Sequence, residues 1–449
     1  MRRRRLLTTA ALALAGCLCR PAYPAVTDAP RLLAIGQKID AYVEPLAGQG
    51  YLSGSLLVVM GGVIAYEKSF GLADYELKVP NTSSTRFNIA SITKPLTVFI
   101  AAHFIESGEL PLKATIDRWF PAFPSGNKIT VEMLLRHRSG IPHRVTTPAQ
   151  ETVPHSAEDM VKFAERADLL FEPGARESYS SAGYSVLARI LELVGGKPYE
   201  ELLREIVLAP AGAVNTAHTD SMHILTGRAS SYFVGPGGPI PAPLKDMSFL
   251  VGAGSVYSTP RDLLAIMRAL RAGTFGQLVL ANYPPDKKLE WSGISNGYRA
   301  FAVHDPEADV TVIFTGNVFA GAIDLVRRDV PKIAAGENVA AARVPLVTPV
   351  AMAMNLRLKY EGAYNLGNSI ERLEFSGPGG RFARLGDWIL IPVSEDVFFS
   401  PQDFAMVKVV LDSTGKVRGL RWGESDDSPV FARVDSDKAT RTTRSRGPI

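Results

Sequence analysis

The pattern of hydrophobic and polar positions predicts helices and antiparallel strands in the first part of the chain. Residues 31–46 carry the amphipathic pattern of a helix. Residues 54–60 and 63–71 are predicted as two strands joined by a double-glycine hairpin turn. The run from Phe87 to Phe104 is apolar almost all the way round at helical spacing, which is typical of a helix buried in the centre of a domain. A hairpin followed by a buried helix indicates an α+β fold, in which helices pack on an antiparallel sheet.

Further helical patterns between residues 129 and 273 predict a helical subdomain beside this sheet. Residues 129–142 form a short helix closed by a glycine turn, and residues 156–170 form a helix capped by Ser156. A loop over 171–184 leads into a helical pattern at 186–194. A last helix starts at Thr259-Pro260-Arg261-Asp262, which combines an N-cap, a proline at the first position and an early acid, and ends near Gly273.

The C-terminal third changes character after one more pair of strands and a helix. Strand patterns at 298–304 and 310–315 precede a helix at 322–335, which we expect on the same sheet face as the N-terminal helix. A proline-punctuated linker occupies 341–355. Beyond it, short alternating strands in under a hundred residues predict a small all-β domain, a barrel or a sandwich, over 356–435. The seven predicted strands are 360–364, 373–375, 388–392, 397–399, 406–411, 417–421 and 429–433.

Composition indicates a globular chain with a targeting segment at its start. The chain has 449 residues, 46% hydrophobic and 21% charged, enough for two domains. Four arginines precede an apolar run too short to span a membrane, which predicts a signal peptide within residues 1–25. Leu14-Ala15-Gly16-Cys17 resembles a lipobox, which predicts cleavage before Cys17 and its acylation. Ordinary cleavage near Ala22 or Ala25 is the alternative, and the arginine run also fits twin-arginine export. We expect a periplasmic lipoprotein that touches the membrane only through this anchor.

Charge and cysteine content exclude several classes of function. Removing residues 1–16 takes away four arginines and no acid, so the formal charge of +4 falls to zero and no nucleic-acid partner is predicted. Because Cys17 and Cys19 are the only cysteines, the mature domain has no disulfide framework, no cysteine nucleophile and no thiolate metal site. The seven histidines show no metal-binding spacing, so no metal and no cofactor are predicted. The basic tail over 436–449 is predicted to be a disordered end.

The sequence Ser91-Ile92-Thr93-Lys94 opens the buried helix and is the first candidate for chemistry. Residues three apart are neighbours on a helix surface, so Ser91 and Lys94 are expected to lie together at its N-terminal end. Unpaired backbone N–H groups and the positive end of the helix dipole are found there, and both suit an oxyanion. Pro95 fits only if the helix begins close to Ser91. The alternative is a serine that only caps the helix.

Two later motifs follow Ser91-x-x-Lys94 in a familiar order. Pro173-Gly174 precedes Tyr179-Ser180-Ser181 and Gly183-Tyr184, and Gly252-x-Gly254 precedes Ser258-Thr259-Pro260-Arg261-Asp262. Together with the stretch over 134–142, these motifs resemble the serine β-lactamase-like superfamily over a domain at residues 30–340. That superfamily includes class C β-lactamases, D-alanyl-D-alanine carboxypeptidases and family VIII carboxylesterases. The resemblance implies a β-lactamase/transpeptidase-like fold followed by a small barrel-like domain.

The resemblance also implies the roles of the site residues. Ser91 would be the acylated nucleophile, Lys94 would share in deprotonating it, and Tyr179 would be the general-base partner. A serine hydroxyl needs such a base, and free lysine and tyrosine have pKa values near 10, so each pKa must be lowered for work at neutral pH. The implied oxyanion hole is the backbone N–H of Ser91 with that of Ile294.

Two departures from the superfamily pattern bear on the substrate. The second motif usually ends in asparagine, where this chain has Ser181. What is called the third motif of the superfamily lies after the Gly252-x-Gly254 segment and usually starts with lysine or histidine, where this chain has Trp291-Ser292-Gly293. Ser181, Trp291 and Gly293 are therefore the predicted substrate-binding residues. The cation that favours a substrate carboxylate is missing, and a Trp-x-Gly motif resembles family VIII carboxylesterases. The alternative for Trp291 is a packed aromatic at a strand edge.

We expect an exported serine hydrolase that acts through an acyl-serine intermediate on a carboxylic ester. Alternatives are a β-lactamase or D-Ala-D-Ala peptidase of the same fold, and a non-catalytic homologue that binds peptidoglycan or a partner. The substrate would be a small ester or amide, or a cell-wall-related molecule. Gly293-Ile294-Ser295-Asn296-Gly297 fits the nucleophile elbow of α/β-hydrolases, but that elbow needs a helix after the serine, and a strand is predicted there.

Overall fold

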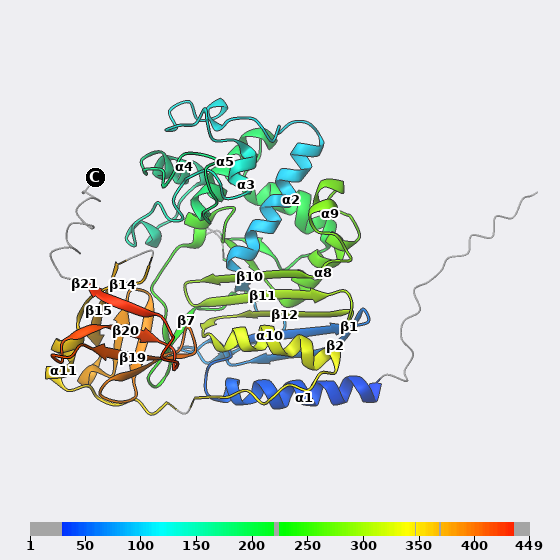
Figure 1. Cartoon of the computed structure of the whole chain (residues 1–449). Coiled ribbons are helices and arrows are strands. Elements are labelled where there is room, and N and C mark those ends of the chain that lie inside the picture. Colours follow the sequence, from blue (N-terminus) through cyan, green and yellow to red (C-terminus); the bar gives the residue numbers. More distant parts are fainter. Residues whose placement is uncertain (1–28, 220–223, 346, 368–369, 435–449) are drawn as a thin grey trace, which may run out of the picture.

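A five-stranded antiparallel sheet forms the centre of the molecule (Figure 1). The computed structural model describes residues 29–219, 224–345, 347–367 and 370–434. The strand order is β10-β11-β12-β1-β2, so the first hairpin of the chain lies beside strands from near the end of the N-terminal domain, the described part of the chain before residue 341. The bounds are β1 Gly54–Met60, β2 Val63–Phe70, β10 Leu289–Ser295, β11 Tyr298–Asp305 and β12 Val310–Gly316. The predicted α+β class is confirmed.

Both faces of this sheet are covered, as the burial along β1 shows. Leu56 and Val58 point to one face, where they join a core with α1 (Ala29–Gly48) and α10 (Ala322–Ala335). Leu57 and Val59 point to the other face and pack in a larger core with the helical part, which comprises the helices between residues 131 and 282. The prediction that the N- and C-terminal helices share a face is therefore confirmed, and Figure 1 shows them side by side.

The buried helix predicted from Phe87 to Phe104 is α2, Thr93–Glu106. A 3₁₀ turn, η2 (Ala90–Ile92), leads into it and carries Ser91. Pro95 lies in the first turn of α2, where a missing backbone N–H costs nothing. Apolar residues on every side of α2 are buried, because the helix crosses the larger core between the sheet and the helical part.

The helical part lies on both sides of α2 in Figure 1. The helix predicted over 156–170 ends earlier, at Glu165, and the helix after the Tyr179 loop starts earlier than predicted, at Ser181. The bounds of the helices are α3 Val131–Leu135, α4 Ala157–Glu165, α5 Ser181–Gly195, α6 Tyr199–Leu202, α7 Ala209–Ala211, α8 Pro260–Arg271 and α9 Gln277–Asn282, with a π-helical turn η5 at Leu203–Leu208. Single 3₁₀ turns are η3 Ile116–Arg118, η4 Gln150–Thr152 and η6 Met247–Leu250.

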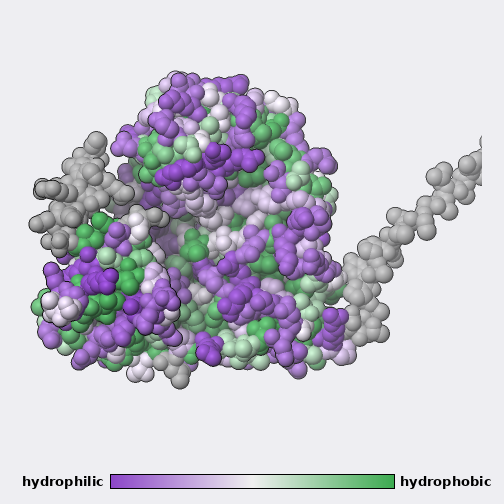
Figure 2. Space-filling model, in the orientation of Figure 1, coloured by the Kyte–Doolittle hydropathy of each residue, from purple (hydrophilic) through white to green (hydrophobic). Residues whose placement is uncertain are grey.

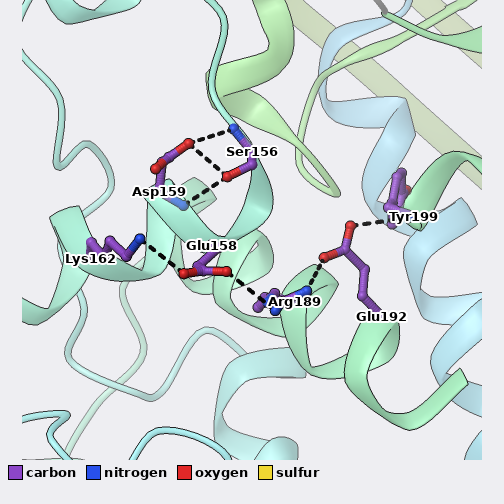
Figure 3. Close-up of polar contacts among 7 residues, drawn as sticks. All are labelled: Ser156, Glu158, Asp159, Lys162, Arg189, Glu192 and Tyr199. Carbon is purple, nitrogen blue, oxygen red and sulfur yellow. Dashed lines mark hydrogen bonds and ion pairs between the residues drawn. The ribbon is translucent and has the colours of Figure 1, made fainter. Parts of the chain in front are cut away.

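Polar contacts fix α4 against α5 (Figure 3). Ser156 caps α4 in a reciprocal capping box with Asp159, as the sequence predicts. Arg189 of α5 lies 3.4 Å from Glu158 of α4 and 3.0 Å from Glu192 on its own helix. Because α5 begins at Ser181, this network supports the helix that presents the second motif.

The structure also contains small sheets that the sequence pattern does not predict. A three-stranded sheet, ordered β13-β7-β8, lies next to the C-terminal domain. Its bounds are β7 Tyr232–Gly235, β8 Gly238–Pro241 and β13 Val318–Phe319. The remaining short strands are β3 Leu72–Asp74, β4 Val79–Pro80, β5 Phe87–Asn88, β6 Ala217–His218 and β9 Val256–Ser258.

The C-terminal strands close into a barrel, which confirms one of the two predicted architectures. It has eight strands, one more than predicted, because the short strand β16 was missed. Its core includes Tyr364, Leu373, Phe398 and Leu420. The bounds are β14 Gly362–Asn365, β15 Ile370–Ser376, β16 Phe382–Leu385, β17 Trp388–Pro392, β18 Val397–Ser400, β19 Ala405–Leu411, β20 Val417–Trp422 and β21 Val430–Val434, after helix α11 at Met354–Tyr360 and with a turn η7 at Pro378–Gly380.

The barrel packs tightly against the N-terminal domain. Phe233 of β7 is buried with Ile389 and Ile391 of β17. The N–H of Gly321 donates to the carbonyl of Pro401 at 2.8 Å, and a Cβ at Gly321 would lie 2.6 Å from the carbonyl oxygen of Gln402. Only a residue without a side chain allows this approach.

The predicted signal peptide, Cys17 and the basic tail lie outside the described residues. Within the part of the chain that the structure covers, no helix has both the length and the apolar character needed to cross a membrane.

Candidate active site

Ser91, Lys94 and Tyr179 meet at the N-terminal end of α2. The Tyr179 hydroxyl donates a hydrogen bond of 2.8 Å to Ser91 Oγ, and Lys94 Nζ lies 3.4 Å from the same oxygen. Lys94 Nζ also donates to Ser181 Oγ at 3.1 Å and to the carbonyl of Ala253 at 2.9 Å. The structure thus brings together the three residues predicted to be catalytic.

Burial decides the charge states of the two candidate bases. Lys94 is only 5% exposed, and desolvation lowers the pKa of its ammonium to about 7. Burial has the opposite effect on Tyr179 and raises its pKa, although the hydrogen bond with Ser91 opposes this rise. The expectation that the pKa of both groups is lowered is therefore wrong for Tyr179. Its phenol keeps its proton at neutral pH, whereas Lys94 titrates there.

His137, from the stretch over 134–142, and His143, directly after that stretch, hold the Tyr179 loop in place. His137 Nδ1 accepts a hydrogen bond from the backbone N–H of Ser180, and His143 Nδ1 accepts one from that of Ser181. Their rings lie 4.5 Å and 5.5 Å from the Tyr179 ring. Burial, together with the nearby Lys94 charge, lowers the pKa of each imidazole to about 4. Both rings are therefore neutral at neutral pH and act as hydrogen-bond acceptors.

The turn before Ser91 is held by Asn88. Its Oδ1 accepts a hydrogen bond from the N–H of Ala90, and its Nδ2 donates one to the carbonyl of Gly254 in the Gly252-x-Gly254 segment. Ala90 has a φ of 47°, the left-handed region that alanine rarely adopts. This strained turn places Ser91 at the mouth of the cleft described below.

The edge strand β10 supplies the second predicted oxyanion donor. Asn296 and Gly297 have positive φ and form a two-residue hairpin turn, so Ser295 and Tyr298 close it as a hydrogen-bonded pair. Alternation along the ladder then turns the N–H of Ile294 away from β11, toward the open edge. A Cβ at Gly293 would lie 2.2 Å from the carbonyl oxygen of Ile89, which shows how closely β10 approaches the Ser91 turn.

Of the three predicted substrate-binding residues, only Ser181 lines the cleft. Trp291 is buried in the larger core, with its ring 6.2 Å from those of Phe99 and Tyr283. The prediction of a substrate contact through its indole needs correction, because Trp291 lies inside β10 and alternation points it inward while Ser292 points outward. Gly293 contributes close packing against the Ser91 turn.

A cleft with a volume of about 540 Å³ opens in front of Ser91. Figure 2 shows the molecule hollowed between the helical part and the barrel. Its walls include residues that the motifs do not contain: His143, Arg144, Lys245, Phe249, Phe319 and, from the turn between β16 and β17, Asp387. His143 directly follows the stretch over 134–142 and could have been found from it, but the other five residues have no local sequence signal.

Two other kinds of site are disfavoured. Ser295 ends a strand and is followed by another strand, so it lacks the strand-to-helix turn of a nucleophile elbow. Across the described residues, His, Cys, Asp and Glu form no group of three or more that could hold a metal ion.

A sheet flanked by helices, with a serine, a lysine and a tyrosine meeting at the start of a buried helix, is typical of a class of serine hydrolases. Residues 39–331 match the beta-lactamase family. The chain belongs to that family.

Relatives and a solved structure carry the same likeness. Over 237 residues the chain is 29% identical to PbpX of Bacillus subtilis, whose name places it among penicillin-binding proteins; the match covers 53% of this chain and 58% of PbpX. The D-alanyl-D-alanine-carboxypeptidase/endopeptidase AmpH of Escherichia coli is 26% identical, covering 53% and 63%. The chain thus spans about three fifths of these relatives. EstCE1, described as a hydrolase with promiscuous acyltransferase activity, shares the fold at 22% identity, with a TM-score of 0.55 over 69% of this chain and all of EstCE1.

Proposed function

We propose that the protein hydrolyses a small carboxylic ester through an acyl-Ser91 intermediate. The observation that carries this proposal is the continuous contact from the Tyr179 hydroxyl to Ser91 Oγ and on to Lys94 Nζ. Two of the Nζ contacts, to Ser181 and Ala253, suit the donors of a neutral amine, and its lone pair is then left for the Ser91 proton.

The charge states above divide the proton transfers between Lys94 and Tyr179. As Ser91 Oγ bonds to the ester carbonyl carbon, its proton passes to neutral Lys94. The negative charge on the carbonyl oxygen is met by the N–H groups of Ser91 and Ile294, each worth about 3–4 kcal/mol of barrier. The C–O bond to the leaving group then breaks, and the leaving oxygen takes the phenolic proton of Tyr179, which Lys94 restores. Water releases the acid by the same steps in reverse.

The preference for an ester rests on the third motif. Trp291 fills the position where a superfamily cation would favour a substrate carboxylate, and its indole is part of the core. The leading alternatives are a β-lactamase or a D-Ala-D-Ala peptidase, and the names of the relatives PbpX and AmpH favour them. The intact Ser91 contacts argue against a role limited to binding.

The test compares substrates and variants of the purified protein. We expect turnover of p-nitrophenyl acetate, slow or no turnover of nitrocefin, and covalent labelling by a fluorophosphonate. Ser91→Ala should lose at least roughly 10³-fold in kcat and all labelling, whereas Ser295→Ala should still be labelled. Rapid nitrocefin turnover without esterase activity would replace the ester proposal by a β-lactamase. Labelling of Ser91→Ala but not Ser295→Ala would overturn the site.

We also propose that the protein is exported and anchored through Cys17. The arginine run, the short apolar segment and the lipobox-like sequence support this proposal. Labelled palmitate should be incorporated into the wild type and not into Cys17→Ala. Wild-type protein without label, recovered from the cytoplasmic fraction, would contradict it.

A further inference from the structure

A buried carboxylate with two cations lies in the wall of the cleft. Glu151 is completely buried, although a lone carboxylate is costly to remove from water. Arg144 Nε lies 3.2 Å from its Oε1, and Lys245 Nζ lies 2.8 Å from its Oε2. Thr146 Oγ1 donates to Oε1 at 3.0 Å. The carboxylate is therefore paired on both oxygens.

The pairing leaves positive charge facing the cleft. Two cations share one carboxylate, so one positive charge is in excess. Both Arg144 and Lys245 line the cleft that holds Ser91. The Arg144 contact to Glu151 runs through Nε, and 47% of its side chain is exposed, so its terminal nitrogens can reach a ligand. Lys245, at 14% exposure, presents further N–H donors.

Apolar residues and one carboxylate surround these two cations in the rest of the cleft. Phe249 and Leu250 follow Lys245 along the chain and line the cleft as apolar neighbours, where a charge is poorly screened. Asp387 brings a negative charge from the barrel wall, but among the described residues no ion pair joins it to Arg144 or Lys245. Glu151 fixes both cations in position before any substrate arrives, which reduces the entropy lost on binding.

We propose that Arg144 and Lys245 bind a carboxylate of the substrate, so that the preferred ester of the Ser91 site is anionic. This inference rests on the proposed ester hydrolysis. The guanidinium offers the planar pair of donors that matches a carboxylate, and the ammonium adds a second positive charge. Arg144 and Lys245 lie on the loop after α3 and the loop before η6, away from the position of Trp291, so the carboxylate that they bind is placed differently from the one that the superfamily cation would favour.

The experiment uses two matched pairs of esters, because the carboxylate could lie on either side of the ester bond. Mono-p-nitrophenyl glutarate is compared with p-nitrophenyl butyrate, and 4-carboxyphenyl acetate with phenyl acetate. In at least one pair, we expect kcat/KM for the anionic ester to exceed that for the neutral ester by about tenfold at low salt. The preference should weaken as ionic strength rises.

Variants assign the preference to the cations. Arg144→Gln, which leaves Lys245 on Glu151, should lose most of the preference, so that the ratio of kcat/KM for the anionic ester to kcat/KM for the neutral ester falls toward one. Arg144→Lys should retain part of it. Lys245→Gln should also lose most of the preference for the anionic ester. A thermal unfolding curve checks that this variant is folded. Arg136→Gln, an exposed arginine paired with Glu132, is the control and should keep the full preference.

The outcomes separate this inference from the proposed function. Turnover of the neutral esters with no anionic preference in either pair would overturn the inference and leave ester hydrolysis in place. An anionic preference that survives both Arg144→Gln and Lys245→Gln would also overturn it. If the wild type turns over neither member of either pair and is not labelled by a fluorophosphonate, the proposed function fails first.

Discussion

Lys94 is the residue whose titration should control the reaction rate. Its pKa is lowered to about 7 by burial, so the neutral amine, which we propose as the acceptor of the Ser91 proton, predominates above that pH. Of its ionisable neighbours, His137 and His143 have pKa values lowered to about 4, and the pKa of Tyr179 and of Tyr184 is raised. None of these four groups titrates near pH 7.

We therefore expect kcat/KM for p-nitrophenyl acetate to rise with pH along one titration curve centred near 7. Below that pH, Lys94 is protonated and cannot take the serine proton, so the rate should fall about tenfold per pH unit in the acid limb. The measurement is kcat/KM between pH 5 and 9 at constant ionic strength. A rate that falls as pH rises through 7 would contradict the role of Lys94 as proton acceptor.

At this scale, motif spacing predicts which residues meet but not where each side chain points. Ser91, Lys94 and Tyr179 follow from three short motifs. The direction of Trp291 does not, because it depends on the strand boundary: β10 starts at Leu289, so Trp291 lies inside a strand whose alternate residues face the core. The Arg144–Glu151–Lys245 cluster also has no local signal, because Lys245 lies about a hundred residues from its partners.

At the scale of elements, strong local signals are reliable and short or unusual strands are not. The double-glycine hairpin, the Ser156 cap and the Thr259-Pro260 helix start all appear as predicted. Strand β8 contains two prolines and is tolerated as the edge of its sheet, so its sequence resembles a loop. Strand β16 has four residues, too few to show alternation clearly.

The approach of β10 to the serine turn provides a test at the scale of elements. Gly293→Ala places a Cβ against the backbone carbonyl of Ile89, which a flexible side chain cannot relieve. Strand β10 must shift and carry the N–H of Ile294 away from the oxyanion. We expect kcat for p-nitrophenyl acetate to fall roughly 10²-fold or more with a smaller change in KM.

The matched control for this variant is Gly48→Ala, where the new methyl group meets no atom within 4 Å. Its kcat and thermal stability should stay near those of the wild type. If Gly293→Ala folds and retains full kcat, β10 does not supply the oxyanion donor.

At the scale of the whole molecule, the barrel forms part of the wall of the cleft. Its β16–β17 turn brings Asp387 into the cleft wall, and Gln402 holds that turn by donating to the carbonyl of Asp387 at 3.1 Å. The backbone of residues 402–404 packs on Gly321 of the N-terminal domain. The cleft therefore depends on how the two parts are joined.

Gly321→Val should loosen this junction. The added side chain would collide with the backbone of residues 402–404, so we expect the barrel to move and the linker at 341–355 to become more sensitive to protease. KM for esters of long or branched acids should change several-fold, while p-nitrophenyl acetate, which needs little of the cleft, should be affected less. Gly237→Ala is the control, with open space around its Cβ. Unchanged kinetics and protease sensitivity in Gly321→Val would argue against a barrel wall in the site.

The order of strands in the central sheet has a consequence for how the chain is made. Strand β1, from residues 54–60, is paired along its length with β12, which is synthesised about 250 residues later. Until then the first hairpin has an open, apolar edge of the kind that other chains can join. The emerging chain therefore carries an edge prone to association until residue 316 is available. The barrel, whose strands pair with their neighbours in sequence and close only from last to first, can fold largely from local contacts once it emerges.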